Sequence, residues 1–237
     1  MTQVCEKVEF SRPQEIREGV RLSLAAGLGI FPIGVAFGLL VVQSGLPWWV
    51  APAMSIVGFS GSLELLLIGM MAVATPLAPI ALTTFLVNFR HVFYAFSFPL
   101  RVVRNPLARF YSVFALVDEA YAVTSARPDG WTSWRLVSMQ LAFHSYWVGG
   151  GLVGLTVAGL LPGPVVGLEF ALCALFLTLT LDACRTGKQV PSLLMAAASF
   201  AFATVLTPDT VMFTGLVLFV AALIVRYVAM QRRREHV

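Results

Sequence analysis

Residues 87–94 read Val-Asn-Phe-Arg-His-Val-Phe-Tyr and lie inside an apolar run from about Pro76 to Leu100. In a helix that rises ~1.5 Å per residue, Arg90 would sit about 15 Å from the ends of that run. A cation at such depth in a bilayer costs about 2.5–3.5 kcal/mol on insertion scales, so it should face protein or water rather than lipid. The stretch therefore predicts a helical membrane span that carries a polar binding site or pathway.

The composition of the whole chain agrees with a membrane protein. Of its 237 residues, 58% are hydrophobic and 12% are charged, whereas soluble domains carry about 25% charged residues. The apolar segments lack the alternation of strands, which predicts an all-α integral membrane protein in contact with the lipid bilayer. The net charge of +4 comes from basic residues at segment ends, a pattern of membrane topology and not of nucleic-acid binding.

The sequence offers no recognisable catalytic or cofactor motif. The three cysteines are scattered and have no metal-ligand spacing. A nucleotide-binding glycine loop, a metalloprotease helix and a nucleophile elbow are all missing. We therefore expect no metal, no cofactor and no enzymatic activity.

Seven apolar segments are each long enough to cross a bilayer. Residues 1–20 precede them as a polar tail, in which a short helix could begin at Pro13, and residues 231–237 follow as a basic tail. We expect a single transmembrane transport domain over residues 21–230. The predicted spans are residues 21–44, 50–74, 76–100, 135–161, 164–184, 190–207 and 209–230.

Residues 110–126 form a different kind of segment. Their apolar positions recur at helical spacing along one stripe, while Asp118 and Glu119 lie off it. This pattern favours an interfacial or re-entrant helix over one that crosses the membrane.

Basic residues predict the orientation of the second half of the chain. Residues 101–135, 185–188 and 226–234 carry the bases and fall on one side, which places the C-terminus in the cytoplasm. The basic N-terminal segment disagrees, because three preceding spans would put it outside. Either the N-terminus is outside, or one early segment does not cross, or residues 110–126 do.

A short internal similarity raises the question of a repeat. Residues 61–65 read Gly-Ser-Leu-Glu-Leu and residues 167–170 read Gly-Leu-Glu-Phe. Each would lie in the second helix of a group of three. Inverted three-plus-three repeats are common in secondary transporters, so the fold is either such a repeat with one added helix, or the match is chance.

The first span is interrupted by Pro32 and is rich in glycine. One interpretation is a broken helix that exposes backbone to a substrate, with Pro32 and Gly34 in contact with it. The other is close helix packing, since Gly34 and Gly38 form a pair of small residues four apart. The residues leave both interpretations open.

The second span contains residues 59–64, Phe-Ser-Gly-Ser-Leu-Glu. An unwound segment here would offer backbone amides to a carboxylate, which makes Ser60 and Ser62 candidate substrate-binding residues. Glu64 could bind an ammonium group or carry a proton, or it could be a structural acid.

The third span has two adjacent polar stripes. Asn88 and His91 lie on one, and Arg90 and Tyr94 lie on the other. Arg90 could bind a substrate carboxylate, with Asn88 beside it, or neutralise a buried acid such as Glu64. His91 could relay protons, because imidazole titrates near neutrality.

Candidates for roles other than substrate binding fall into two groups. The proton-coupling candidates are Glu64, His91 and Glu169. The candidates for gating or for a structural polar role are Asp118, Glu119, Tyr94 and His144.

Several of these motifs resemble the AzlC-type family of branched-chain amino acid permeases, over about residues 18–230. The most specific are residues 87–94, the segment from Pro32 to Gly38, and residues 59–62. Residues 118–121 also fit. Ser60 and Glu64 differ from many members, which have alanine and glutamine there, and match the BrnF-like exporter branch.

The resemblance implies the large subunit of a secondary exporter in a bacterial inner membrane. Its substrates would be leucine, isoleucine, valine and also methionine, and its export would be proton-coupled. Its partner would be a small, separately encoded membrane subunit of the AzlD type. The alternative is a porter or channel for another small solute on the same fold.

Overall fold

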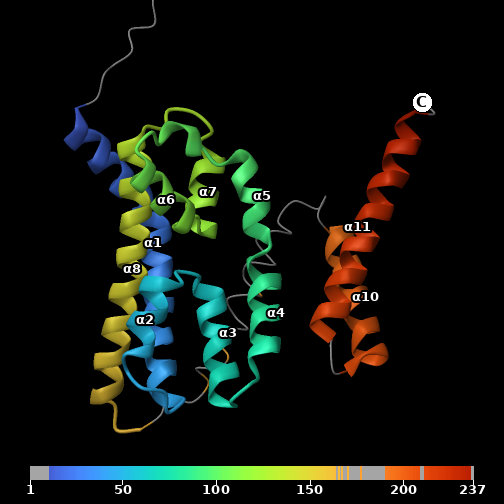
Figure 1. Cartoon of the computed structure of the whole chain (residues 1–237), viewed down its shortest axis with the longest axis horizontal. Coiled ribbons are helices and arrows are strands. Elements are labelled where there is room, and N and C mark those ends of the chain that lie inside the picture. Colours follow the sequence, from blue (N-terminus) through green and yellow to red (C-terminus); the bar gives the residue numbers. More distant parts are fainter. Residues whose placement is uncertain are drawn as a thin grey trace, which may run out of the picture. The chain divides into compact units, whose positions relative to one another are not determined.

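The computed structural model describes residues 11–163, 190–208 and 211–235, together with positions 165, 167, 170 and 177. Every regular element among these residues is a helix, which agrees with the predicted all-α class. The chain forms two compact units, Met1–Leu172 and Cys173–Val237. Each unit is described by itself (Figure 1).

Two long parallel helices form the central scaffold of the first unit. They are α1, Arg12–Gln43, and α8, Ser133–Leu160, and both are long and apolar enough to cross a membrane. At ~1.5 Å per residue they measure about 48 and 42 Å, against about 30 Å for the hydrocarbon core of a bilayer. Helix α1 thus begins nine residues before the predicted start of the first span, within the segment expected as a polar tail.

Glycines let α1 and α8 approach each other closely. A Cβ atom added to Gly34 would lie 2.9 Å from the carbonyl oxygen of Trp147, and one added to Gly38 would meet that of Gly151. Helix α1 continues unbroken through Pro32. Of the two interpretations left open, the broken first helix is therefore wrong, and the structure confirms close packing of small residues.

The predicted second span is a helical hairpin and not a crossing helix. It consists of α2, Val50–Val57, and α3, Gly61–Ala72. Between them Phe59 adopts a positive φ of 38°, which bulky side chains rarely do. Figure 1 shows that α2 and α3 both lie in the half of the unit where α1 ends. We call residues 50–72 the first hairpin.

Residues 106–126 form a second hairpin in the opposite half of the unit. It consists of α6, Pro106–Phe114, and α7, Asp118–Ala126, and it follows the short 3-10 helix η1, Leu100–Val102. Figure 1 shows α6 and α7 near the beginning of α1. The link Ala115–Leu116–Val117 is buried. The segment is therefore re-entrant, as one of the predicted alternatives, but two helices replace the single one expected over residues 110–126.

The predicted third span crosses the unit as two consecutive helices. They are α4, Leu77–Asn88, and α5, Arg90–Ser97, and Phe89 interrupts them beside Arg90. This interruption lies between the heights of the two hairpins (Figure 1). Among the described residues of this unit, three helical paths thus run its length, namely α1, α4–α5 and α8, and two hairpins enter it from opposite ends.

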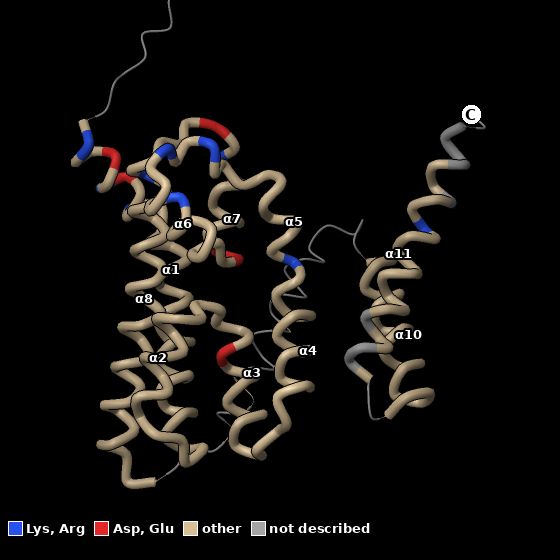
Figure 2. Tube along the Cα trace, in the orientation of Figure 1, with Lys and Arg blue, Asp and Glu red and all other residues tan. Residues whose placement is uncertain are grey.

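Charge is gathered at one end of this unit. Figure 2 shows the described basic residues of this unit, apart from Arg90, around the beginning of α1 and the hairpin α6–α7. The turns at the other end, residues 44–49, 73–76 and 161–163, carry no charged side chain. Since the first hairpin returns to the end where it starts, the basic N-terminal segment and residues 101–135 lie at the same end. The conflict in the predicted topology is thereby removed, because one early segment does not cross.

The described residues of the second unit form two long apolar helices. These are α10, Val190–Leu206, and α11, Val211–Glu235, and they match the predicted spans 190–207 and 209–230. Arg226 Nη1 donates to Ser192 Oγ at 2.6 Å, and Thr207 Oγ1 donates to Thr214 Oγ1 at 2.8 Å. Most of the predicted span 164–184 lies outside the described residues, so the inverted repeat stays a prediction.

Candidate functional site

The tips of the two hairpins meet beside the interruption between α4 and α5. The rings of Phe59 and Phe114, one from each hairpin, have centroids 6.2 Å apart. A pocket of about 260 Å³ opens between them, near the lower limit of about 300 Å³ for small-molecule sites. Its lining residues are Gly58, Phe59, Ser60, Asn88, His91, Val113, Phe114 and Leu116.

The polar side of this pocket is formed by residues that sequence analysis selected. Ser60 Oγ donates to Asn88 Oδ1 at 3.0 Å, which ties the first hairpin to α4. The ring nitrogen Nδ1 of His91 lies 3.0 Å from the carbonyl oxygen of Asn88. The structure thus brings together Ser60, Asn88 and His91, which the sequence placed on two separate segments.

Glu64 holds the tip of the first hairpin in place. Its side chain is buried and accepts three hydrogen bonds, from Ser55 Oγ at 2.9 Å, from the backbone N–H of Ser60 at 2.9 Å and from Trp147 Nε1 at 3.0 Å. The bond to Ser60 satisfies an amide at the break that no longer has a helical partner. Glu64 does not line the pocket, but its hydrogen bond to Ser60 connects it to the pocket wall.

Gln140 of α8 performs the same task for the second hairpin, and sequence analysis did not select it. Its Nε2 donates to the carbonyl oxygens of Ser112 at 2.8 Å and Ala115 at 2.9 Å, and its Oε1 accepts from Ser112 Oγ at 2.7 Å. Gln140 is fully buried. These contacts occupy carbonyl groups that the end of α6 leaves without helical donors. A lone amide in an apolar span was the available signal.

His144 lies on α8 between Gln140 and Trp147, the residue that donates to Glu64. Positions 140, 144 and 147 share one helical face. His144 Nε2 lies 3.1 Å from the carbonyl oxygen of Ser55, and its ring stacks on Phe59 with centroids 4.2 Å apart. Its Nδ1 lies 3.3 Å from the hydroxyl of Tyr111. One stripe of α8 thus binds both hairpins through Gln140, His144 and Trp147.

Arg90 is bound to Asp118 and Ser62. Its Nη2 lies 2.8 Å from Asp118 Oδ2 and donates to Ser62 Oγ at 2.9 Å. Tyr94 OH donates to Asp118 Oδ1 at 2.8 Å. The acid that neutralises Arg90 is therefore Asp118, and the suggested pairing with Glu64 is wrong. The Nε atom of Arg90 is buried without a hydrogen-bond partner among the described residues.

Arg90 connects the two hairpins without entering the pocket itself. Ser62 belongs to the first hairpin and Asp118 begins α7 of the second, so both are held by one guanidinium on α5. Arg90 is absent from the pocket lining, whereas its neighbour His91 is present. The ion pair therefore locks the relative position of the two pocket walls.

The other selected residues lie elsewhere. Gly34 faces α8 in the packing described above, and Pro32 lies within the continuous α1. Glu119 follows Asp118 on α7 and is half-buried outside the pocket lining. Glu169 is outside the described residues. Within the described part of the chain, no three histidine, cysteine, aspartate or glutamate side chains converge as a metal site.

These features define a class of protein, an all-helical membrane protein with two hairpins around a partly polar pocket. The sequence profile of the AzlC protein family matches residues 25–161, which contain every residue of the pocket. The chain belongs to the AzlC family. No solved structure matches the chain.

The chain is also similar to membrane proteins of several bacteria. An uncharacterized membrane protein of Helicobacter pylori is 31% identical over 158 residues, which cover 65% of this chain and 69% of the relative. The inner membrane protein YgaZ of Escherichia coli is 28% identical over 69% of this chain and 71% of its own length. The branched-chain amino acid transport protein AzlC of Bacillus subtilis is 26% identical over 65% of this chain and 62% of its own length.

Proposed function

We propose that the chain is the large subunit of a secondary exporter of branched-chain amino acids. The observation that carries this proposal is the pocket between the hairpin tips, which combines polar and apolar walls in a family whose Bacillus subtilis member is named for branched-chain amino acid transport. Leucine, isoleucine, valine and methionine share a zwitterionic head and an apolar tail. A site for them needs both kinds of wall.

The pocket divides in a way that suits such a molecule. Phe59, Val113, Phe114 and Leu116 supply apolar surface for the side chain, while Ser60, Asn88 and His91 supply polar groups for the head. The first amides of α3 have no helical acceptors and favour an anion at the beginning of that helix. We place the substrate carboxylate next to Ser60 on this basis, and the side chain between the two phenylalanines.

The two hairpins supply one gate for each side of the membrane. Bases concentrate in cytoplasmic segments of membrane proteins, so we assign the arginine-rich end of the first unit and the C-terminus to the cytoplasm. The second hairpin would then open toward the cytoplasm and the first hairpin toward the outside. In the state described, one Arg90 side chain holds both hairpins through Ser62 and Asp118.

Coupling to protons rests on groups at or behind the pocket. His91 lines it and Glu64 contacts its wall through Ser60, so a change in either charge would alter the polar half of the site. Glu169, the third candidate for proton coupling, lies outside the described residues. We propose His91 as the first residue to test, because it is the titratable side chain that lines the pocket in the described structure.

A small membrane subunit of the AzlD type is the proposed partner. The experiment that tests both parts feeds cells a branched-chain dipeptide and follows isoleucine, leucine and valine inside and outside. The host lacks its own exporter and expresses this chain with or without the neighbouring small membrane gene. Lower internal pools and faster release with both genes together support a two-part exporter, and release by this chain alone removes the partner from the proposal.

Transport of another small solute is the alternative function. Unchanged amino acid pools in every strain, with the protein present in the membrane, would favour it. Counterflow with a panel of labelled amino acids and other small solutes then identifies the substrate, because the 260 Å³ pocket limits it to a small molecule. Purified protein in vesicles with and without a pH gradient separates proton coupling from simple exchange.

A further inference from the structure

We propose a binding site for an anionic phospholipid on the outer face of α1, at the arginine-rich end of the first unit. A pocket of about 610 Å³ lies there, remote in sequence from the residues of the transport pocket. Three of its five lining residues are arginines and one is an acid. They are Gln14, Arg17, Glu18, Arg21 and Arg135.

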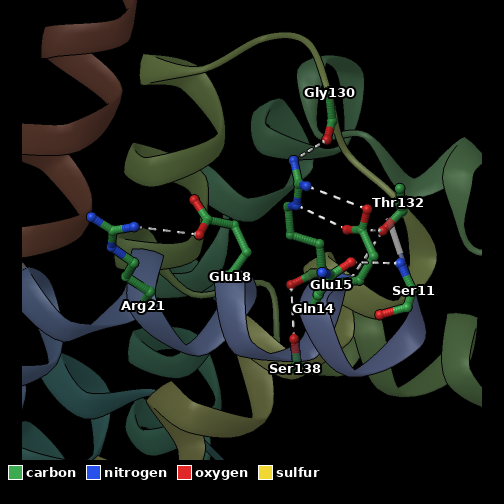
Figure 3. Close-up of polar contacts among 9 residues, drawn as sticks. Ser11, Gln14, Glu15, Glu18, Arg21, Gly130, Thr132 and Ser138 are labelled. Carbon is green, nitrogen blue, oxygen red and sulfur yellow. Dashed lines mark hydrogen bonds and ion pairs between the residues drawn. The ribbon is translucent and has the colours of Figure 1, made fainter. Parts of the chain in front are cut away.

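The wall of this pocket is rigid on the side of α8. Arg135 Nε lies 3.0 Å from Glu15 Oε2, and its Nη1 donates to the carbonyl oxygen of Gly130 at 2.6 Å. Thr132 Oγ1 also donates to the buried Glu15 at 2.8 Å. Figure 3 shows Glu15, Gly130 and Thr132 around one point, with Glu18 and Arg21 to one side. A fixed arginine thus forms the back of the pocket.

The side of α1 carries two exposed arginines. Arg17 makes no ion pair among the described residues. Arg21 is bound only weakly, with Nη1 3.9 Å from Glu18 Oε2 and 78% of its side chain exposed. Exposed pairs of this kind contribute about 0–1 kcal/mol. A phosphate can therefore take the place of Glu18 on Arg21 and bind Arg17 at the same time.

The same face of α1 continues into an apolar stripe, which selects a lipid over a free anion. Arg17, Arg21, Leu24 and Leu28 follow at intervals of four, three and four residues, so they share one helical face. Leu24 is 49% exposed and Leu28 is 77% exposed. At ~1.5 Å per residue, Leu28 lies about 10 Å below Arg21 along the helix axis. This order of charge and apolar surface matches a phosphate headgroup above an acyl chain.

The depth of the pocket also suits a lipid headgroup. Helix α1 is about 18 Å longer than the ~30 Å hydrocarbon core, so its first turns lie at the membrane surface. Basic pockets between helices on the cytoplasmic side are a known form of anionic headgroup recognition. The site is separate from the proposed substrate pocket, and its occupancy does not depend on which solute the protein carries.

The test titrates phosphatidylglycerol into the purified full-length chain in detergent and follows its melting temperature. Phosphatidylcholine, glycerol phosphate and inorganic phosphate are the comparison probes. The variant Arg17→Gln/Arg21→Gln removes the two exposed arginines. Its control is Arg104→Gln/Arg109→Gln, which makes the same charge change at two exposed arginines outside the pocket.

We expect phosphatidylglycerol to raise the melting temperature of the wild type and of the control variant. The Arg17→Gln/Arg21→Gln variant should need about 30-fold more lipid for the same shift, at about 1 kcal/mol for each arginine near an anionic surface. An equal response in both variants overturns the site. An equal effect of glycerol phosphate or inorganic phosphate overturns the lipid as its ligand. Melting without lipid should be the same in all three proteins, because both substituted side chains are exposed.

Discussion

Arg90 and Asp118 form an ion pair, with Nη2 2.8 Å from Oδ2, between residues that the predicted topology had placed in separate segments. The pair joins α5 to the beginning of α7, and Ser62 of α3 shares the same Arg90 nitrogen. Both charged side chains are about one-third exposed, so water or a solute reaches the pair. This single contact therefore connects the positions of both hairpins to a group that a charged ligand can approach.

Removal of Arg90 should abolish transport. In Arg90→Ala the two hairpins lose their common partner, and Asp118 keeps only the hydrogen bond from Tyr94. Arg90→Lys retains the charge but not the planar fork, so we expect a partial loss. Uptake or efflux in cells measures the effect, with membrane insertion checked by fractionation. Normal transport by Arg90→Ala would show that transport does not require Arg90.

Removal of Asp118 should destabilise the protein less than removal of one partner of a fully buried ion pair. Asp118→Ala leaves Arg90 with Ser62, and we expect it to lower the free energy of unfolding by about 1 kcal/mol, because solvent screens the pair. Fully buried pairs cost about 3–5 kcal/mol when one partner is removed. Thermal melting in detergent compares Asp118→Ala with Asp118→Asn. A loss as large as that of a buried pair would mean that the contact is structural and closed to solvent.

Glu64 should prove essential for the fold of the first hairpin. Glu64→Ala leaves the hydroxyl of Ser55, the amide of Ser60 and the indole N–H of Trp147 without their acceptor. Each buried unsatisfied donor costs about 1–3 kcal/mol, so the variant should melt far below the wild type. Glu64→Gln keeps one acceptor oxygen, so its melting temperature should fall between those of Glu64→Ala and the wild type. If Glu64→Gln folds well but loses the response to a pH gradient, Glu64 carries the proton as well.

Gln140 should hold the second hairpin in the same manner. Gln140→Leu removes the donor to the carbonyl oxygens of Ser112 and Ala115, and should cost about 2 kcal/mol or more of stability. Ser145→Ala is a matched control on α8, because the Ser145 hydroxyl binds only its own helix at Leu141. Melting temperatures of the two variants give the comparison. Equal stability would show that the second hairpin does not depend on Gln140.

Two glycines of α1 should respond oppositely to alanine. A Cβ on Gly38 would meet the carbonyl oxygen of Gly151, so Gly38→Ala should cost about 1–3 kcal/mol through overpacking. A Cβ on Gly29 meets nothing within 4 Å, so Gly29→Ala should be neutral or stabilise the helix by about 1 kcal/mol. Unfolding curves of both variants measure the difference. A similar effect at both positions would contradict the close contact between α1 and α8.

Much of this site could be predicted from the sequence, because charges inside apolar segments are costly and therefore conspicuous. Arg90 and Glu64 were found in this way, whereas Asp118 was selected as a polar residue off the apolar stripe of residues 110–126. Their partners could not be predicted, since pairing depends on how segments fold back on one another. A break at Phe59 turns residues 50–74 into a hairpin, and apolar length alone gives no sign of it. The reversal of that segment also decides the side on which the N-terminus lies.

Gln140 shows a second limit of sequence analysis. Gln140 is uncharged and lies in an apolar span, and no prediction was made for it from the sequence. Its importance comes from two carbonyl groups that exist as free acceptors only because α6 ends at Phe114. Pro32 shows an ambiguity of the same kind, since a residue that commonly breaks helices lies within a continuous one, and the sequence left both interpretations open.

The most direct measurement asks whether leucine occupies the pocket between the hairpin tips. In a chain with its three cysteines replaced by serine, Val113→Cys places a thiol in the pocket wall, and Val73→Cys places one at the end of α3 outside it. Both valines are more than half exposed, so a small thiol reagent reaches them. We expect leucine to slow modification of the thiol at position 113 and to leave modification at position 73 unchanged. Equal rates with and without leucine at both positions would contradict binding of leucine in this pocket.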